Sequence, residues 1–213
     1  DSLAKLRGDE QTVAKTTAFD LQMNPANPGM QFHKLDRAKD KNFWSVRVGS
    51  DLRLIVHRTG SSLLLCYVGH HDSAYQWAER RKIERHPTTG AAQIVEIRET
   101  VREIEIPQYV HREVPETPAT KKALLFAEIN DADLLGYGVP GEWLEDVRAA
   151  DEDRLFELVD HLPREASEAL LELATGSTPK RPVHAAEDAD PFVHPDAQRR
   201  FRVVGDAEEL QRA

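Results

Sequence analysis

The chain has 213 residues, of which 40% are hydrophobic, with a single cysteine and a net charge of −9 at neutral pH. No apolar run approaches the roughly 20 residues that a membrane-spanning helix needs, and a lone cysteine excludes a disulfide scaffold. The length predicts one or two domains. We therefore expect a globular protein of the cytoplasm, a reducing compartment in which Cys66 is a buried thiol.

The negative charge is unevenly distributed along the chain. Residues 1–118 carry a net charge of +1, whereas residues 119–213 carry −10. Residues 29–86 are the most basic stretch, with a net charge of +5 and five of the nine histidines. Such a stretch is typical of a surface that binds a polyanion, and equally of solvated surface. The overall charge therefore argues against nucleic acid only for the second half.

The first half follows the order helix, three strands, helix. Apolar residues between Leu3 and Leu21 have helical spacing, and the prolines and glycine of residues 24–29 end that helix. Three strands follow at residues 43–48, 52–58 and 62–68. Their short connectors predict consecutive antiparallel hairpins, and the continuous apolar run of the third predicts a central strand. A helix from Ser73 to about Glu84 completes the unit.

The second half is predicted to be helical. A further strand, 92–105, and a proline-containing linker, 107–118, lead into it. Short helices are expected at residues 121–129, 131–135, 140–148, 151–161 and 164–174. Asp131, Asp151 and Pro163 occupy helix starts, and Gly136 and Gly176 occupy helix ends.

These patterns predict an α+β fold class with four segments. An α+β domain spans residues 1–106, the linker residues 107–118, an acidic helical module residues 119–176, and a second linker residues 177–213.

Three strings of the first half occur together in one order. They are SVRV at Ser45–Val48, LRLIV at Leu52–Val56, and YVGHHDSAY at Tyr67–Tyr75. In this order they resemble toxins of the RelE/ParE superfamily, over about residues 1–86. The resemblance implies helices packed on a twisted antiparallel sheet.

The resemblance also implies roles for single residues. Arg53 matches a phosphate-binding arginine, Arg47 a sheet lysine, His71 the second basic residue after Val-Gly, and Tyr75 the tyrosine that opens the helix. In the RNA-cleaving members, cations stabilise charge on the phosphoryl oxygens while a titratable group protonates the leaving 5′ oxygen. Ser45 departs from the pattern, because the active ribonuclease has a further lysine there. Branch members that target proteins share the fold without this chemistry.

Each of these residues also has a simpler interpretation. Arg47 and Arg53 are equally expected as exposed strand residues paired with Asp51 or Glu96. His71 is equally expected at a helix cap or on the surface.

Other residues near the motif are predicted to be structural. Tyr75 and Trp77 are typical of packing against the sheet, and Trp44 of the core. Lys34, next to His33, adds to a phosphate-facing rim. His70 and His71 are adjacent on a predicted strand, so their side chains point to opposite faces of the sheet. They therefore cannot bind one metal ion together, and no metal site is expected.

The strings of the second half suggest a wider context. DLLGYGVP at Asp133–Pro140 and DPFVHPDAQRRFRVV at Asp190–Val204 follow the toxin-like block. This order resembles the amino-terminal region of UvrD/Rep-like DNA helicases. No Gly-x4-Gly-Lys-Ser/Thr motif occurs in the 213 residues, so ATP and magnesium are expected only in a motor domain missing from this chain.

Three functions follow as alternatives. The first is an accessory module of such a helicase, which contacts DNA or RNA through Lys34, Arg47, Arg53 and His71. The second is an endoribonuclease that uses Arg53, Arg47, His71 and Tyr75. The third is a protein-binding module that uses a sheet edge or the acidic helices. None of them needs a cofactor in this chain or a membrane.

Overall fold

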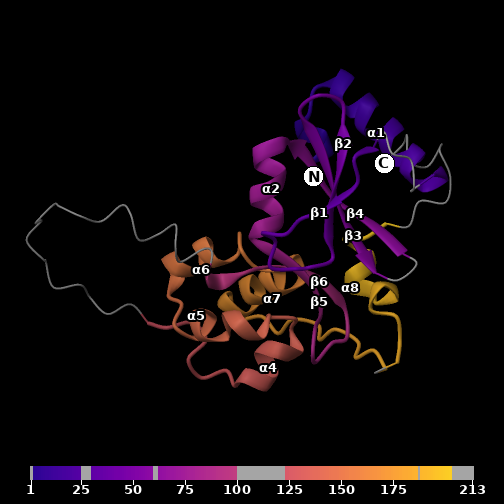
Figure 1. The fold of residues 1–213 in the computed structure, drawn as a ribbon. Coiled ribbons are helices and arrows are strands. Elements are labelled where there is room, and N and C mark those ends of the chain that lie inside the picture. The colour runs from indigo at the N-terminus through magenta and orange to yellow at the C-terminus, as the bar shows by residue number, and fades with distance from the viewer. Residues whose placement is uncertain (1, 25–29, 60–61, 100–122, 187, 203–213) are drawn as a thin grey trace, which may run out of the picture. The chain divides into compact units, whose positions relative to one another are not determined.

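The computed structural model describes residues 2–24, 30–59, 62–99, 123–186 and 188–202 (Figure 1). Its contacts divide the chain into two compact units, one ending at Lys82 and the other spanning Ile83–Arg202. This boundary lies earlier than the predicted end of the first domain at residue 106. The predicted linker 107–118 lies outside the described residues.

The first unit is a four-stranded antiparallel sheet with helices. Its elements are η1 (Leu3–Lys5), α1 (Gly8–Met23), β1 (His33–Lys34), β2 (Phe43–Val48), β3 (Leu52–Thr59), β4 (Ser62–His70) and α2 (His71–Glu79). The spatial order β1-β2-β3-β4 confirms the predicted hairpins. Among the described residues β4 pairs only with β3, so the predicted central position of this strand is wrong. Its apolar run is explained by the helix that covers it, because α2 contacts both β3 and β4.

Alternating residues of the strands face two different helices. Val46 and Val48 belong to the core shared with Ala14, Ala18 and Leu21 of α1. The other alternating residues of β2, Phe43, Ser45 and Arg47, face the side of α2. There the ring of Phe43 lies 5.7 Å from that of Trp77 on α2. The sheet is therefore covered on both faces, although Arg47 at the end of the second face stays exposed.

Two predicted boundaries near α2 are wrong. The helix predicted at Ser73–Glu84 begins at His71 and ends at Glu79. Residues Arg81–Arg85 instead form β5, which pairs with β6 (Ala92–Glu96). Pairing between strands provides hydrogen bonds that a local helical pattern does not reveal. The predicted strand 92–105 ends at Glu96, and residues 98 and 99 are helical.

The second unit contains β6 and short helices around one core. Its helical elements are α4 (Asp131–Gly136), η4 (Gly141–Trp143), α5 (Leu144–Arg148), α6 (Glu152–Leu158), α7 (Arg164–Ala174), η5 (Pro191–Val193) and α8 (Pro195–Gln198). Leu134, Trp143, Leu158 and Leu170 are among the buried residues of this core. The predicted helix 121–129 is wrong, because residues 123–129 contain no helix. The buried ring of Phe126 and a bond from the Leu125 amide to the Ala150 carbonyl hold this stretch in place.

The helix ends of the second unit largely follow their sequence signals. Asp151 caps α6 by accepting from the Arg154 amide, as predicted. The cap of α4 is Asn130 rather than Asp131. α4 ends at Gly136, as predicted, and Gly138, two residues later, has a φ of +87° that other residues rarely adopt.

The segment 177–202 was expected to be a linker but is packed into the second unit. Ala197 is fully buried and His194 is 4% exposed. Among the described residues, no helix is both long and apolar enough to cross a bilayer.

Candidate functional site

Arg47 and Arg53 lie directly opposite each other on β2 and β3. Arg47 donates from Nε to the Gly49 carbonyl at 2.8 Å, and Arg53 donates from Nη1 to the Leu52 carbonyl at 2.8 Å. Like charges that face each other across two strands repel. Both side chains belong to the α2 face of the sheet, where this repulsion favours a bound anion.

The simpler interpretation of these arginines, pairing with Asp51 or Glu96, is wrong. Asp51 Oδ2 lies 2.7 Å from His70 Nδ1. Glu96 belongs to the second unit, where its Oε2 lies 3.3 Å from His161 Nδ1. Within the ranges that the structure describes, neither arginine has a carboxylate partner.

A chain of hydrogen bonds links Tyr75 to Arg47. The Tyr75 hydroxyl lies 2.9 Å from His33 Nε2, and His33 Nδ1 lies 3.0 Å from the Gln31 carbonyl oxygen. Arg47 Nη1 donates to Gln31 Oε1 at 3.3 Å. A carbonyl oxygen only accepts, so His33 Nδ1 carries a proton, and in the neutral ring Nε2 accepts the tyrosine proton. The geometry thus connects a titratable pair to one of the two arginines.

His71 is the first residue of α2 and lies against the same tyrosine. Its ring centroid is 4.2 Å from that of Tyr75. Its Nδ1 lies 2.9 Å from Asp72 Oδ1, which orients the ring and leaves Nε2 as the outer nitrogen. The structure therefore brings together three of the predicted residues, Tyr75, His71 and Arg47, through the histidine and glutamine that join them.

A cavity of about 410 Å³ opens beside this pair. Its walls include His33, His71 and Tyr75 together with Lys34 and residues 35–38 of the loop after β1.

Lys34 pairs with Trp44 on β2, whereas Ser45 pairs with His33. Trp44 lies on the α1 face, where its ring stacks on Phe32 at 5.0 Å, and it is only partly buried rather than core.

Two residues of the site, His33 and Gln31, were not predicted as functional groups. His33 was expected only as part of a rim, and Gln31 was not singled out. Gln31 has a φ of +45°, the only positive value of a non-glycine residue within the described ranges. No local motif marks it, because its role depends on long-range contacts with Arg47 across the sheet.

Ser45 is fully buried between its register partners His33 and Ile55. Its hydroxyl has no hydrogen-bond partner among the described residues. Because position 45 is a serine rather than a lysine, it adds no positive charge to this face of the sheet. The positive charge on this face of β2 and β3 therefore comes from Arg47 and Arg53.

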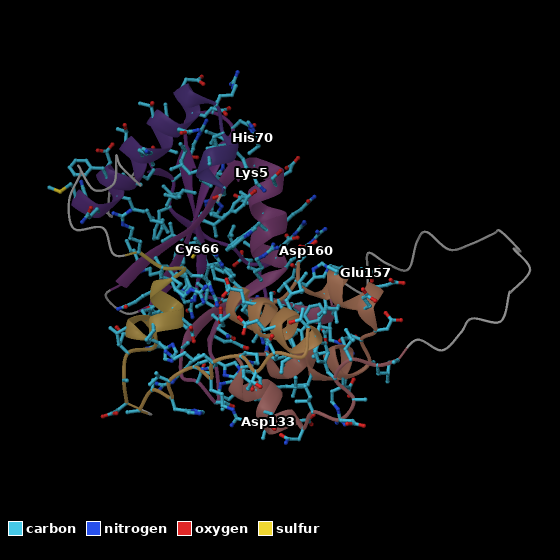
Figure 2. The ribbon with its side chains drawn as sticks, turned by 180° about the vertical axis from the view of Figure 1, so that it is seen from behind. Lys5, Cys66, His70, Asp133, Glu157 and Asp160 are labelled. Atoms are coloured by element: carbon cyan, nitrogen blue, oxygen red, sulfur yellow. The ribbon has the colours of Figure 1, made fainter. Side chains whose placement is uncertain are left out.

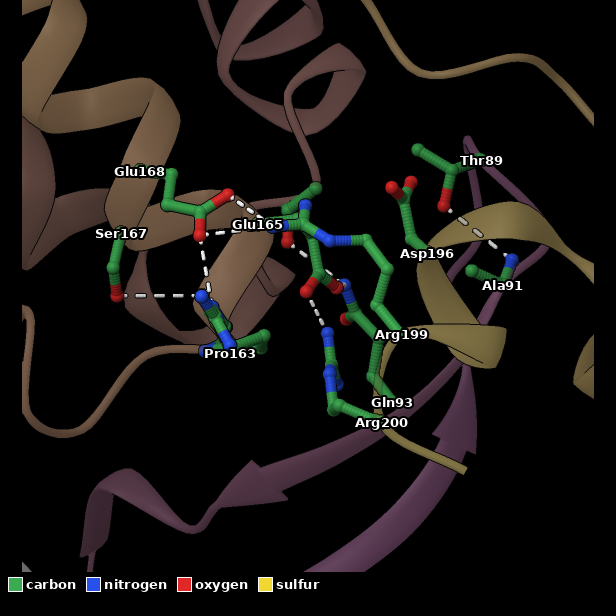
Figure 3. A network of polar contacts seen from close by, with 12 residues as sticks. Thr89, Ala91, Gln93, Pro163, Glu165, Ser167, Glu168, Asp196, Arg199 and Arg200 are labelled. Atoms are coloured by element: carbon green, nitrogen blue, oxygen red, sulfur yellow. Dashed lines mark hydrogen bonds and ion pairs between the residues drawn. The ribbon is translucent and has the colours of Figure 1, made fainter. Parts of the chain in front are cut away.

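A buried polar network joins distant segments of the second unit. Glu165, 8% exposed, accepts from Gln93 Nε2 at 2.7 Å and forms an ion pair with Arg200 (Figure 3). Gln93 Nε2 also donates to the Gly138 carbonyl at 3.0 Å. Burial away from water lowers the pKa of Arg200 to about 10, which leaves it charged at neutral pH. These contacts are structural, because they join α7 and the segment of Arg200 to β6 and to the loop after α4.

His86 is a second buried titratable group with a structural role. Its Nε2 donates to the Val139 carbonyl at 3.0 Å, and its Nδ1 accepts from the amides of Thr88 and Thr89. Burial lowers the pKa of His86, and its bond to Val139 opposes this change. The ring is therefore neutral and joins two loops of the second unit.

Cys66 (Figure 2) is the extra residue of a β-bulge in β4. Its thiol donates to the Leu64 carbonyl at 3.3 Å. Burial raises the pKa of Cys66 to about 12, so almost no thiolate exists at neutral pH. The thiol is therefore not a nucleophile of the site.

We expect Cys66 to resist a thiol reagent in the folded protein. At pH 8, modification by a disulfide reagent should be about a thousandfold slower than after unfolding in guanidinium, because only the thiolate reacts. The release of the coloured thiol product measures the rate, and the lone cysteine makes the end point unambiguous. Rapid labelling of the folded protein would contradict this assignment.

Within the described ranges, no group of three or more His, Cys, Asp or Glu side chains is placed to hold a metal ion. Comparisons with protein-family models, with curated proteins and with solved structures find no match for this chain.

Proposed function

We propose that the first unit binds the phosphate backbone of nucleic acid through Arg47 and Arg53, on a fold of RelE/ParE type. The observation that carries the proposal is the pair of opposed guanidinium groups without a carboxylate partner in the described chain. A phosphate between them relieves their repulsion and accepts from both forks. The basic stretch 29–86 supplies a field of the same sign.

The proposal is tested by binding of the full chain to fluorescein-labelled single-stranded RNA and DNA. Anisotropy should report binding that weakens as salt rises, with a slope of about −0.7 on logarithmic axes for each phosphate contacted. No binding at low salt, or binding that ignores salt, would contradict it. A pull-down that recovers a protein and no nucleic acid would favour the protein-binding alternative instead.

A second candidate, RNA cleavage, is favoured by the hydrogen bond between Tyr75 and His33. In such a reaction the 2′ oxygen bonds to phosphorus while the bond to the 5′ oxygen breaks. The 2′ proton passes to His71 Nε2, whose ring Asp72 orients. The Tyr75 hydroxyl gives its proton to the 5′ oxygen, and His33, whose Nε2 lies 2.9 Å from the Tyr75 oxygen, positions that hydroxyl. Arg47 and Arg53 stabilise the charge on the phosphoryl oxygens.

Replacing Tyr75 with phenylalanine should slow RNA cleavage about a hundredfold, the usual scale of a lost general acid. Binding should be retained, because the ring still packs against His71. Gel analysis of end-labelled RNA for products with a 2′,3′-cyclic phosphate measures the rate. Tyr137→Phe in the second unit is the matched control. Absence of cleavage by the wild type, or an equal rate in Tyr75→Phe, would leave binding as the function.

The helicase context is a separate proposal, which rests on the strings of the second half. It is tested by the gene: a Gly-x4-Gly-Lys-Ser/Thr motif encoded downstream is expected, and its absence would contradict the context.

A further inference from the structure

Tyr67 stands on the same face of the sheet as the two arginines. It is in register with Ile55 on β3, and two residues along β4 Gly69 is in register with Arg53. Residues two apart on a strand share a face. Arg47, Arg53 and Gly69 therefore form one row across β2, β3 and β4.

The ring of Tyr67 lies over Gly69. A Cβ atom at position 69 would lie 2.8 Å from Tyr67 Cε1, closer than real Cβ atoms approach, and a tight 3.2 Å from the Tyr67 hydroxyl oxygen. The ring is also held by Trp77, which stacks on it at 5.1 Å with an angle of 15°. The absence of a side chain at Gly69 thus lets the hydroxyl reach the row that contains Arg53.

Packing explains the ring of Tyr67 but leaves the hydroxyl without a role. Among the described residues the hydroxyl has no hydrogen-bond partner, and the side chain is only partly buried. A tyrosine hydroxyl in a packed setting usually finds a partner. Phenylalanine would stack on Trp77 equally well, so the oxygen points to a ligand.

We infer that the Tyr67 hydroxyl donates a hydrogen bond to the phosphate held by Arg53. This inference rests on the proposed nucleic-acid binding and extends the binding row from the two arginines to β4. Opposite residues of neighbouring strands are about 5 Å apart, so one phosphate is within reach of both side chains. Tyrosine is a neutral donor and releases no counterion when it binds.

The test compares variants of the full chain by anisotropy with a labelled single-stranded RNA over a salt series. Tyr67→Phe should weaken binding about tenfold, as expected for a hydrogen bond to a charged acceptor. Its salt dependence should equal that of the wild type, whereas Arg53→Ala should flatten it. Gly69→Ala should weaken binding to a similar extent, because the new methyl group displaces the ring without removing the hydroxyl.

Gly8→Ala is the control for the glycine variant. A Cβ atom at Gly8, the first residue of α1, meets nothing within 4 Å. Unchanged binding in Tyr67→Phe, when Arg53→Ala does lose affinity, would overturn the role of Tyr67 alone. Absence of binding by the wild type would overturn the proposed function itself. Circular dichroism of each variant shows whether the sheet is retained.

Discussion

Replacing both strand arginines, Arg47→Ala with Arg53→Ala, is expected to weaken binding of single-stranded RNA about a hundredfold, or about tenfold for each arginine. The magnitude of the logarithmic salt slope should fall by about 0.7, because the contact with the phosphate held between the two arginines is lost. The free energy of unfolding should stay constant or rise by up to about 1 kcal/mol, because two opposed cations are removed. Weaker binding by a protein that is no less stable is the signature of a binding surface.

Anisotropy over a salt series measures the first two quantities, and urea unfolding measures the third. The control removes the same charge elsewhere. Lys5 (Figure 2) and Lys180 are exposed cations, one in each unit, so Lys5→Ala with Lys180→Ala should leave the affinity within about twofold. Equal losses in the two double variants would show that net charge alone drives binding.

Removing the carboxylate of Glu165 is expected to lower the free energy of unfolding of the second unit by about 3–5 kcal/mol. Arg200 then remains as a buried charge without its ion-pair partner, and Gln93 loses an acceptor. Urea unfolding followed by circular dichroism measures the change in Glu165→Ala. The expected loss is large because water does not reach the guanidinium group, which burial has already made harder to charge.

Glu168 on the same helix provides the matched control. Its side chain is 41% exposed and pairs with Arg164 and Arg199. Glu168→Ala should cost less than about 1 kcal/mol, because solvent screens exposed pairs. Glu165→Leu combined with Arg200→Leu should recover most of the stability lost in Glu165→Ala. If Glu165→Ala cost no more than Glu168→Ala, residues 177–202 would not be held by this ion pair.

The sequence predicted the first unit well because its signals are local. Turn residues between the strands and the alternation within them specify a meander, and the structure has it. The same alternation places Arg47 and Arg53 on neighbouring strands of one sheet. The C-terminal end of α2 was mispredicted, because the strand pair β5–β6 competes for residues 81–85 through contacts that the local pattern does not contain.

The predicted site was incomplete for a similar reason. Tyr75 and His71 were recognisable from a string of adjacent residues, whereas Gln31 and His33 reach the site from a different part of the chain. The place of Tyr67 depends on the space above Gly69, which a sequence expresses only as one more glycine.

By itself, the sequence determined the α+β class, the hairpin order, most helix ends of the second half and the two strand arginines, since each follows from residues close together in the chain. Only the tertiary structure decided which strand lies at the sheet edge, that residues 177–202 pack into the second unit, and that no carboxylate among the described residues meets Arg47 or Arg53. These outcomes depend on burial and on hydrogen bonds between distant segments. Those contacts arise only when the chain is packed, so no local pattern records them.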